Sequence, residues 1–132
     1  MDAQQQSGRI LIVEDEESIR LWLRRLLSRH GYVVSEAANL SGALDIIDDQ
    51  PLDLAIFDMI LPEKQTGLKL LRYLRAHPTA AGVPAMILTG RDLLPEEEEE
   101  ARVFKAHVVL KPVDSKELVS LIERLIAARQ VK

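Results

Sequence analysis

Short apolar runs alternate with amphipathic segments along the whole chain. Five runs are predicted to be strands, at residues 9–14, 32–37, 52–58, 84–89 and 107–110. All except the second are almost continuously apolar and are flanked by polar residues, which is typical of strands covered on both faces. The second run is rich in β-branched residues, which also favour a strand.

The segments after these runs have helical periodicity, at about residues 16–29, 39–49, 68–76, 95–105 and 114–129. The first has an apolar stripe that includes Trp22. Gly31 stands where a C-cap glycine is expected, and Asn39 where an N-cap is expected. Asp114 and Glu117 have the spacing of a capping box. Strict alternation of strands and helices predicts a doubly wound α/β fold, in which one parallel five-stranded sheet carries helices on both faces.

Composition restricts the class of protein. The chain has 132 residues, 47% of them hydrophobic and 29% charged, which fits one globular domain. The absence of cysteine excludes disulfides and thiolate metal sites, and the scattered histidines do not suggest zinc. A net charge of −4 without a basic stripe argues against direct nucleic-acid binding. No apolar stretch approaches the roughly 18 residues of a membrane span. We expect a cytoplasmic domain preceded by a disordered polar tail at residues 1–8.

Reactive side chains stand at the carboxyl ends of four predicted strands. They are Glu14, Asp15, Asp58, Thr89 and Lys111. Carboxyl ends of parallel strands meet at one edge of an open α/β sheet, where ligands bind. Each residue alone has an ordinary structural explanation, such as a helix N-terminal acid or a surface lysine. Their joint placement favours a functional site.

The residue types at these strand ends indicate a particular chemistry. If the first and third strands are neighbours, Glu14, Asp15 and Asp58 bring three carboxylates together. Such crowding raises pKa values and destabilises the fold unless a cation joins the carboxylates, and Mg²⁺ is the usual cation when phosphate is also bound. Lys111 can pair with a carboxylate or a phosphoryl group, and the Thr89 hydroxyl can donate to the same group. The combination suits phosphoryl transfer onto a carboxylate.

Four sequence motifs together resemble the receiver domain of two-component response regulators. In chain order they are ILIVEDE, LAIFDMILP, MILTG and VVLKP. The resemblance extends from about Arg9 to Arg129 and implies a receiver domain over residues 9–130. It also implies a flavodoxin-like three-layer sandwich with five helices and strand order 2-1-3-4-5, which places the first and third strands side by side.

The resemblance implies a role for each strand-end acid. Asp58 corresponds to the aspartate that accepts a phosphoryl group from a phosphohistidine on a sensor histidine kinase or a histidine phosphotransfer protein. Glu14 and Asp15 correspond to the acidic pair that holds Mg²⁺ together with Asp58. The backbone carbonyl of Ile60 is implied as a further metal ligand.

The resemblance also implies how the domain responds. Thr89 corresponds to the switch hydroxyl that moves onto the phosphoryl group, and Lys111 to the lysine that pairs with that group. Pro112 corresponds to a proline that follows a cis peptide bond. Ile60 and Arg91 occupy positions that tune the lifetime of the phosphoryl group in the family.

The chain departs from the family pattern at three places. Gly67 follows Pro62 by five residues instead of four, so we expect one extra residue within 63–66, near the phosphorylation site. Val108 replaces an aromatic residue whose ring usually swings inward as the switch hydroxyl moves. Phe104-Lys105 replaces a small Gly-Ala pair before the last strand. This last change alters a face where many members bind partners or dimerise.

We therefore expect a signalling domain that is phosphorylated on Asp58 and then changes its contacts with a downstream protein target or output domain. It is not expected to be a conventional enzyme, since it would catalyse only its own phosphorylation and slow dephosphorylation. A monomer and a phosphorylation-dependent homodimer both fit. A receiver-like interaction domain that does not use phosphate is an alternative, favoured by Val108 and by the altered partner face at Phe104-Lys105. A phosphatase of the haloacid dehalogenase type is disfavoured, because Ile60 stands where that class has a second aspartate.

Overall fold

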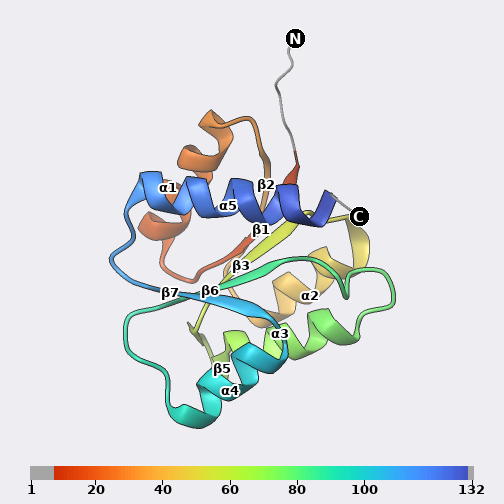
Figure 1. The fold of residues 1–132 in the computed structure, drawn as a ribbon, viewed down its shortest axis with the longest axis vertical. Helices are drawn as coiled ribbons and strands as arrows, with labels where there is room; N and C mark the ends of the chain where they lie inside the picture. Colours follow the sequence, from red (N-terminus) through yellow and green to blue (C-terminus); the bar gives the residue numbers. More distant parts are fainter. Residues whose placement is uncertain (1–7, 131–132) are drawn as a thin grey trace.

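A five-stranded parallel sheet forms the centre of the molecule (Figure 1). The computed structural model describes residues 8–130, so the predicted tail lies outside the described residues except for Gly8. The sheet order is β2-β1-β3-β6-β7, which confirms the predicted order 2-1-3-4-5. The strands are β1 (Arg9–Val13), β2 (Val33–Ala37), β3 (Leu54–Asp58), β6 (Ala85–Thr89) and β7 (Ala106–Leu110).

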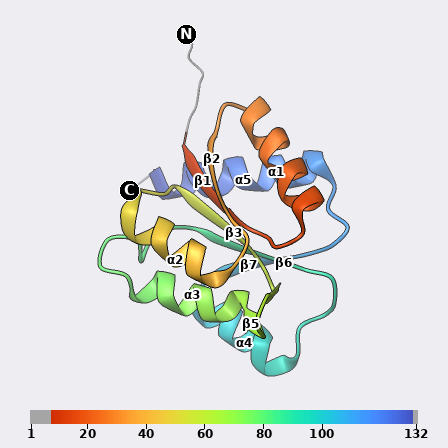
Figure 2. The ribbon, with the colours of Figure 1, turned by 180° about the vertical axis from the view of Figure 1, so that it is seen from behind.

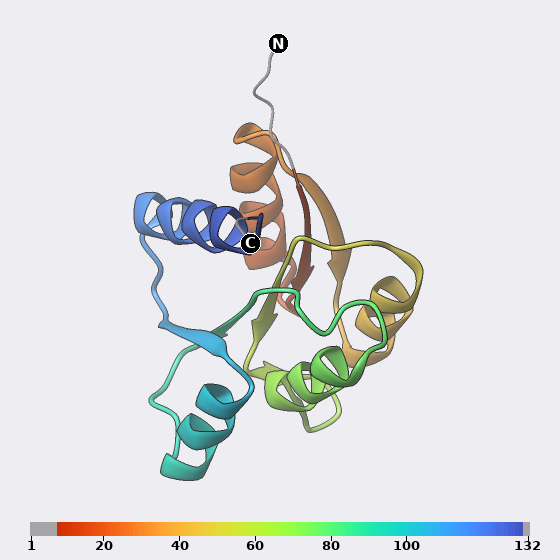
Figure 3. The ribbon, with the colours of Figure 1, turned by 45° about the vertical axis from the view of Figure 1, so that its right-hand side comes forward.

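Helices cover both faces of the sheet and complete a three-layer sandwich (Figures 1 and 3). One face carries α1 (Glu17–Arg29) and α5 (Ser115–Gln130). The opposite face carries α2 (Leu40–Asp49), α3 (Gly67–Ala76) and α4 (Pro95–Val103). Seen from behind, α2 and α3 lie side by side across this second face (Figure 2). The five-helix α/β class predicted from the alternation is confirmed.

Alternate residues of the central strands supply the two halves of the hydrophobic core. On β1, Ile10 and Ile12 face α1 and α5, whereas Leu11 and Val13 face the other helices. On β3, the fully buried Phe57 lies on the α2–α4 side. Burying each such side chain contributes about 1.5–3 kcal/mol, so the central strands are held firmly and their carboxyl ends have fixed positions.

The predicted helix ends are largely confirmed. Asn39 Oδ1 accepts a hydrogen bond of 2.8 Å from the Gly42 amide at the start of α2. Gly31 follows α1 with φ 90°, a left-handed conformation that suits glycine. Asp114 Oδ2 accepts from the Glu117 amide at 3.1 Å, which is one half of the predicted capping box.

The segment after Asp58, which lies between the third predicted strand and the third predicted helix, is a small antiparallel hairpin. It consists of β4 (Ile60–Leu61) and β5 (Gln65–Thr66). Glu63 and Lys64 at its tip both have positive φ, 63° and 60°. The Gln65 amide donates to the Pro62 carbonyl across this tip at 3.3 Å. The presence of an extra residue within 63–66 remains a prediction, and the structure places that stretch at the hairpin tip and in β5.

Two expectations about burial are wrong. The fifth strand was expected to be covered on both faces, but β7 is a sheet edge on which Val108 is 40% and Leu110 51% exposed. The glutamate-rich α4 beside β7 buries only Ala101, so it supplies little apolar cover. Trp22 belongs to the predicted apolar stripe of α1 but is 39% exposed. The helix predicted over residues 95–105 ends at Val103.

Arg75 fastens the turn between α4 and β7, where the sequence has Phe104-Lys105. Its guanidinium donates to the carbonyls of Phe104 at 2.7 Å, Val83 at 2.5 Å and Ala81 at 3.0 Å. Lys105 has φ 61°, a conformation that a glycine would adopt without strain. Burial of the guanidinium lowers the pKa of Arg75.

Among the helices within residues 8–130, none has the length and apolar character needed to cross a membrane.

Candidate functional site

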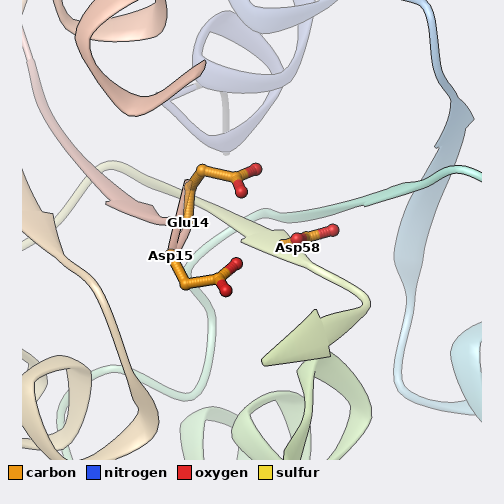
Figure 4. A group of neighbouring side chains, drawn as sticks. All are labelled: Glu14, Asp15 and Asp58. Atoms are coloured by element: carbon orange, nitrogen blue, oxygen red, sulfur yellow. The ribbon is translucent and has the colours of Figure 1, made fainter. Parts of the chain in front are cut away.

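Three carboxylates gather at the carboxyl edge of the sheet (Figure 4). Glu14 and Asp15 directly follow β1, and Asp58 ends β3. The two strands are hydrogen-bonded neighbours, with Val13 paired to Phe57. One oxygen of each carboxylate lies within 4.8 Å of the others. The strand pairing therefore produces the acidic cluster that the sequence predicted.

Lys111 enters the cluster from the far edge of the sheet. Its Nζ atom lies 3.1 Å from Asp58 Oδ1 and 3.5 Å from Glu14 Oε1. Its backbone amide donates to the Thr89 carbonyl at 2.8 Å, which ties the end of β7 to β6. The Lys111–Pro112 peptide bond is cis, as predicted. The lysine thus bridges two of the three carboxylates.

The electrostatics of the cluster are unbalanced, because three carboxylates face one ammonium group. Glu14 is only 2% exposed, and its pKa is raised by burial and by the charge of Asp58. Its Oε2 accepts from the Glu16 amide at 3.1 Å, but Oε1 is buried and accepts no hydrogen bond from any residue within 8–130. Burial alone would lower the pKa of Lys111, but its pairing with Asp58 and Glu14 outweighs burial and raises that pKa. The cluster therefore retains an excess of negative charge.

These residues fit a hard divalent cation. Oxygen atoms of carboxylates are the ligands that such cations prefer, and the orphan Oε1 of Glu14 lies within the cluster. A bound cation would satisfy that oxygen and neutralise the excess charge. The arrangement can hold a metal ion through Glu14, Asp15 and Asp58. Ile60 lies two residues beyond Asp58 with an exposed side chain, and a role for its carbonyl as a metal ligand remains a prediction.

Gly67 supports the Asp58 backbone in a way that the sequence did not reveal. A Cβ atom at this position would lie 2.6 Å from the Asp58 carbonyl oxygen. The Gly67 amide donates to the Met59 carbonyl at 2.9 Å, and the Met59 amide donates to Leu88 at 2.8 Å. Close packing of the α3 N-terminus against the strand end requires a residue without a side chain. Only the placement of these segments in space shows this requirement.

The Thr89 side chain is turned toward its own loop. Thr89 is 1% exposed at the end of β6, next to the strand that carries Asp58. Its Oγ1 donates to the Arg91 carbonyl at 2.8 Å and accepts from the Arg91 amide at 3.2 Å. Among the described residues, no hydrogen bond joins Thr89 to Asp58. The structure therefore brings Thr89 to the predicted edge but engages its hydroxyl elsewhere.

Val108, which replaces the expected aromatic residue, lies on the open edge of the sheet. It lines a groove of about 420 Å³ between α4 and β7, together with Thr89, Arg91 and Ala101. A valine is too short to fill this groove. The sequence showed that an aromatic residue is missing at position 108. The structure shows that the groove lined by Val108 and Thr89 is open as a result.

Comparison with known proteins agrees with the fold. Residues 10–123 match the family model of the response regulator receiver domain. The chain is 35% identical over 117 residues to the uncharacterized transcriptional regulatory protein YkoG of Bacillus subtilis, covering 89% of this chain and 50% of YkoG. It is 34% identical over 127 residues to the TorCAD operon transcriptional regulatory protein TorR of Escherichia coli O157:H7, covering 93% of this chain and 54% of TorR. It spans about half the length of these curated relatives.

Solved structures of receiver domains have the same fold as this chain. A CheY-like response regulator receiver domain protein from Methanospirillum hungatei superposes with a TM-score of 0.85 at 29% identity, covering 95% of this chain and 98% of the other. The signal receiver domain of a histidine kinase from Syntrophus aciditrophicus superposes with a TM-score of 0.84 at 28% identity, covering 96% and 95%. The order of the strands, the acidic cluster and these similarities lead to one conclusion: the chain belongs to the receiver domain family of two-component response regulators.

Proposed function

We propose that this domain accepts a phosphoryl group on Asp58 from a phosphohistidine of a sensor histidine kinase or a histidine phosphotransfer protein. The observation that carries the proposal is the Asp58 carboxylate itself, which is 9% exposed, paired with Lys111 and flanked by two further acids. An Asp58 oxygen attacks the phosphorus, and the bond from phosphorus to the donor imidazole breaks. The electron pair stays on the imidazole nitrogen, and an acyl phosphate forms.

The other residues of the cluster have complementary parts in this reaction. Glu14 and Asp15 would hold Mg²⁺ together with Asp58, and the ion supplies positive charge to the phosphoryl oxygens. Lys111, already 3.1 Å from Asp58, is placed to pair with another of those oxygens. The buried Thr89 hydroxyl can donate to the phosphoryl group after it leaves Arg91. Each group stabilises charge and needs no covalent chemistry of its own.

An apolar groove beside the acidic cluster supports a protein as the phosphodonor. The groove has a volume of about 480 Å³, and its lining includes Ile19, Trp22 and Lys111. A small phosphodonor would not need the partly exposed tryptophan that lines this groove together with Lys111. Aromatic residues that stay partly exposed on a surface are frequent anchors of protein contacts. The donor protein would cover this groove while its phosphohistidine reaches Asp58.

The domain would act on other proteins. Since the chain spans about half the length of YkoG and TorR, its output is either a separate protein target or a further domain of a longer protein. We infer that phosphorylation changes how the α4–β7 side contacts this target, because Thr89 lines the groove there. The reaction is stoichiometric and modifies the domain itself, so it is not turnover of an external substrate.

One experiment tests the phosphoryl transfer. The protein is incubated with acetyl phosphate and Mg²⁺, and its intact mass is measured. We expect one added phosphoryl group on the native chain. We expect none on Asp58→Asn and none when EDTA removes the metal. Asp53→Asn is a matched control that leaves the cluster intact and should still be modified.

Three other outcomes have distinct meanings. No adduct from acetyl phosphate or from any phosphorylated donor protein would support the interaction domain that does not use phosphate, which the open groove at Val108 favours. Rapid hydrolysis of many phosphate esters would support a phosphatase. Modification that persists in Asp58→Asn would place the acceptor elsewhere.

A further inference from the structure

A chain of contacts leads from Thr89 to the first turn of α4. The Thr89 hydroxyl donates to the Arg91 carbonyl at 2.8 Å and accepts from the Arg91 amide at 3.2 Å. The Arg91 side chain reaches forward to Glu97, with nitrogen-to-oxygen distances of 2.9 and 3.1 Å. Glu97 Oε1 also accepts from the Leu94 amide at 2.7 Å, immediately before α4 begins. One carboxylate thus holds both the loop and the helix terminus.

The contact between Arg91 and Glu97 has the geometry of a specific ion pair. Two guanidinium nitrogens meet two carboxylate oxygens, an arrangement that fixes orientation as well as distance. Arg91 Nη1 also donates to the Asp92 carbonyl at 2.9 Å, which restrains the loop further. The hydrogen bond from Arg91 holds the pKa of Glu97 below its ordinary value, so the pair is charged at neutral pH.

A hydroxyl that binds a phosphoryl group on Asp58 must give up its bond to the Arg91 carbonyl. In the receiver family, an aromatic side chain at the position of Val108 usually moves inward when the switch hydroxyl moves. Here that position holds a short valine that is 40% exposed. The groove that such a ring would fill is lined by Thr89, Arg91 and Ala101. The connection from Thr89 to the surface therefore runs along the loop to α4.

We propose that Arg91 and Glu97 are positioning residues that hold the Thr89 hydroxyl away from Asp58, and that opening of their ion pair transmits phosphorylation to α4. The inference rests on the proposed function of Asp58. A phosphoryl group shifts a conformational equilibrium only through contacts that differ between the two conformations. The Thr89–Arg91 bond is such a contact, and the ion pair couples it to the helix.

The coupling between the ion pair and the phosphoryl site acts in both directions, so the affinity of Asp58 for a phosphoryl analogue can measure it. If the ion pair favours the conformation in which Thr89 faces Arg91, weakening it must strengthen binding of a phosphoryl analogue at Asp58 by the same factor. Beryllium fluoride, which coordinates a carboxylate as a phosphoryl group would, is the probe, with Mg²⁺ present. Trp22 is the only tryptophan and lines the groove beside Lys111, so its fluorescence can report binding.

The test variant is Glu97→Gln, and Glu99→Gln is its matched control. Both remove one negative charge from α4 and one ion pair with an arginine, but Glu99 pairs with Arg102 on the outer surface. Glutamine at position 97 can still accept from the Leu94 amide. We expect Glu97→Gln to bind beryllium fluoride about two- to fivefold more tightly, the range for an exposed ion pair, and Glu99→Gln to match the native chain.

A second background and a second readout separate positioning from general loosening. In Arg91→Ala, replacement of Glu97 should no longer change the affinity, because the pair is already broken. The amide resonances of Arg91 and Leu94 should shift on addition of beryllium fluoride to the native chain, and should start partly shifted in Glu97→Gln.

The possible results distinguish failure of the ion-pair role from failure of Asp58 as the acceptor. Equal affinities for the native chain, Glu97→Gln and Glu99→Gln would overturn the role of the ion pair while leaving Asp58 as the acceptor. An effect of Glu97→Gln that persists in Arg91→Ala would also overturn it. If the native chain neither binds beryllium fluoride nor takes up a phosphoryl group, the proposed function fails, and this inference fails with it.

Discussion

Replacing Glu14 by glutamine should stabilise the domain when no metal ion is bound. The native cluster holds three carboxylates against the single ammonium group of Lys111. Glutamine keeps the size of the side chain, and its oxygen can still accept from the Glu16 amide. Lys111 loses a contact of 3.5 Å but keeps Asp58 at 3.1 Å. The substitution removes more repulsion than attraction.

The magnitude follows from the distances. At an effective dielectric constant of about 20, two like charges 4.8 Å apart repel by about 3.5 kcal/mol, and Glu14 faces two of them. Attraction to Lys111 at 3.5 Å is about 5 kcal/mol on the same scale. Water screens the exposed Asp15, whereas burial of the Glu14 charge adds a cost of its own. We expect a net gain of about 1–2 kcal/mol for the variant, or about 3–5 °C in Tm per kcal/mol.

The pH dependence of stability independently predicts that Glu14→Gln is stabilising at neutral pH. Burial raises the pKa of Glu14 above its ordinary value of 4.5, so the folded protein binds this proton more tightly than the unfolded chain. The native domain therefore gains stability as pH falls from the folded pKa toward 4.5, where Glu14 becomes neutral in both states. The advantage of glutamine should be largest at neutral pH and should disappear in acid.

Thermal and urea unfolding in EDTA, followed at several pH values, measure this difference. Glu17→Gln is the control, since it removes an exposed carboxylate from the first turn of α1 without touching the cluster. Mg²⁺ at 100 times its Kd for the native chain should then stabilise that chain by about 2.7 kcal/mol, and should stabilise Glu14→Gln by less. A variant that is less stable than the native chain at pH 7 in EDTA, or a gain that persists below pH 4.5, would refute the reasoning.

Two substitutions outside the acidic cluster test how the scaffold supports it. Arg75→Met should cost about 2–4 kcal/mol in urea unfolding, because it leaves several backbone carbonyls without their charged donor, whereas Arg72→Met removes only an exposed ion pair and should cost under about 1 kcal/mol; equal losses would contradict this. Gly67→Ala should lower stability by about 1–3 kcal/mol and slow modification of Asp58 by acetyl phosphate, because its Cβ meets the Asp58 carbonyl, whereas Gly82→Ala has open space and should behave like the native chain.

Local features of the sequence explain why the acidic site could be predicted. Apolar runs that end in Glu14, Asp58 and Lys111 show where strands end, and parallel strands send those ends to one edge. The residue types then indicate their chemistry without any knowledge of distances. The order of the strands came from the family resemblance, because alternation alone allows several arrangements of a doubly wound sheet.

Burial at the edge of the sheet could not be predicted in the same way. The run before Lys111 is as apolar as the central strands, yet β7 has a neighbouring strand on one side only and the polar α4 beside it. Exposure of Val108 therefore depends on which element covers it, and no pattern within the strand records that. Trp22 is exposed for the same reason, since α1 turns part of its apolar stripe toward an open groove.

The sequence by itself determined the α/β class, the strands and the five strand-end residues, because these depend on periodicity and on residue type at each position. Only the tertiary structure decided that Gly67 packs against the Asp58 carbonyl, and that Thr89 bonds to Arg91 rather than to Asp58. It also decided that Arg91 pairs with Glu97. The first contact joins two segments that meet only in the folded protein, and the other two depend on the path of the loop between β6 and α4, which no apolar period in the sequence records.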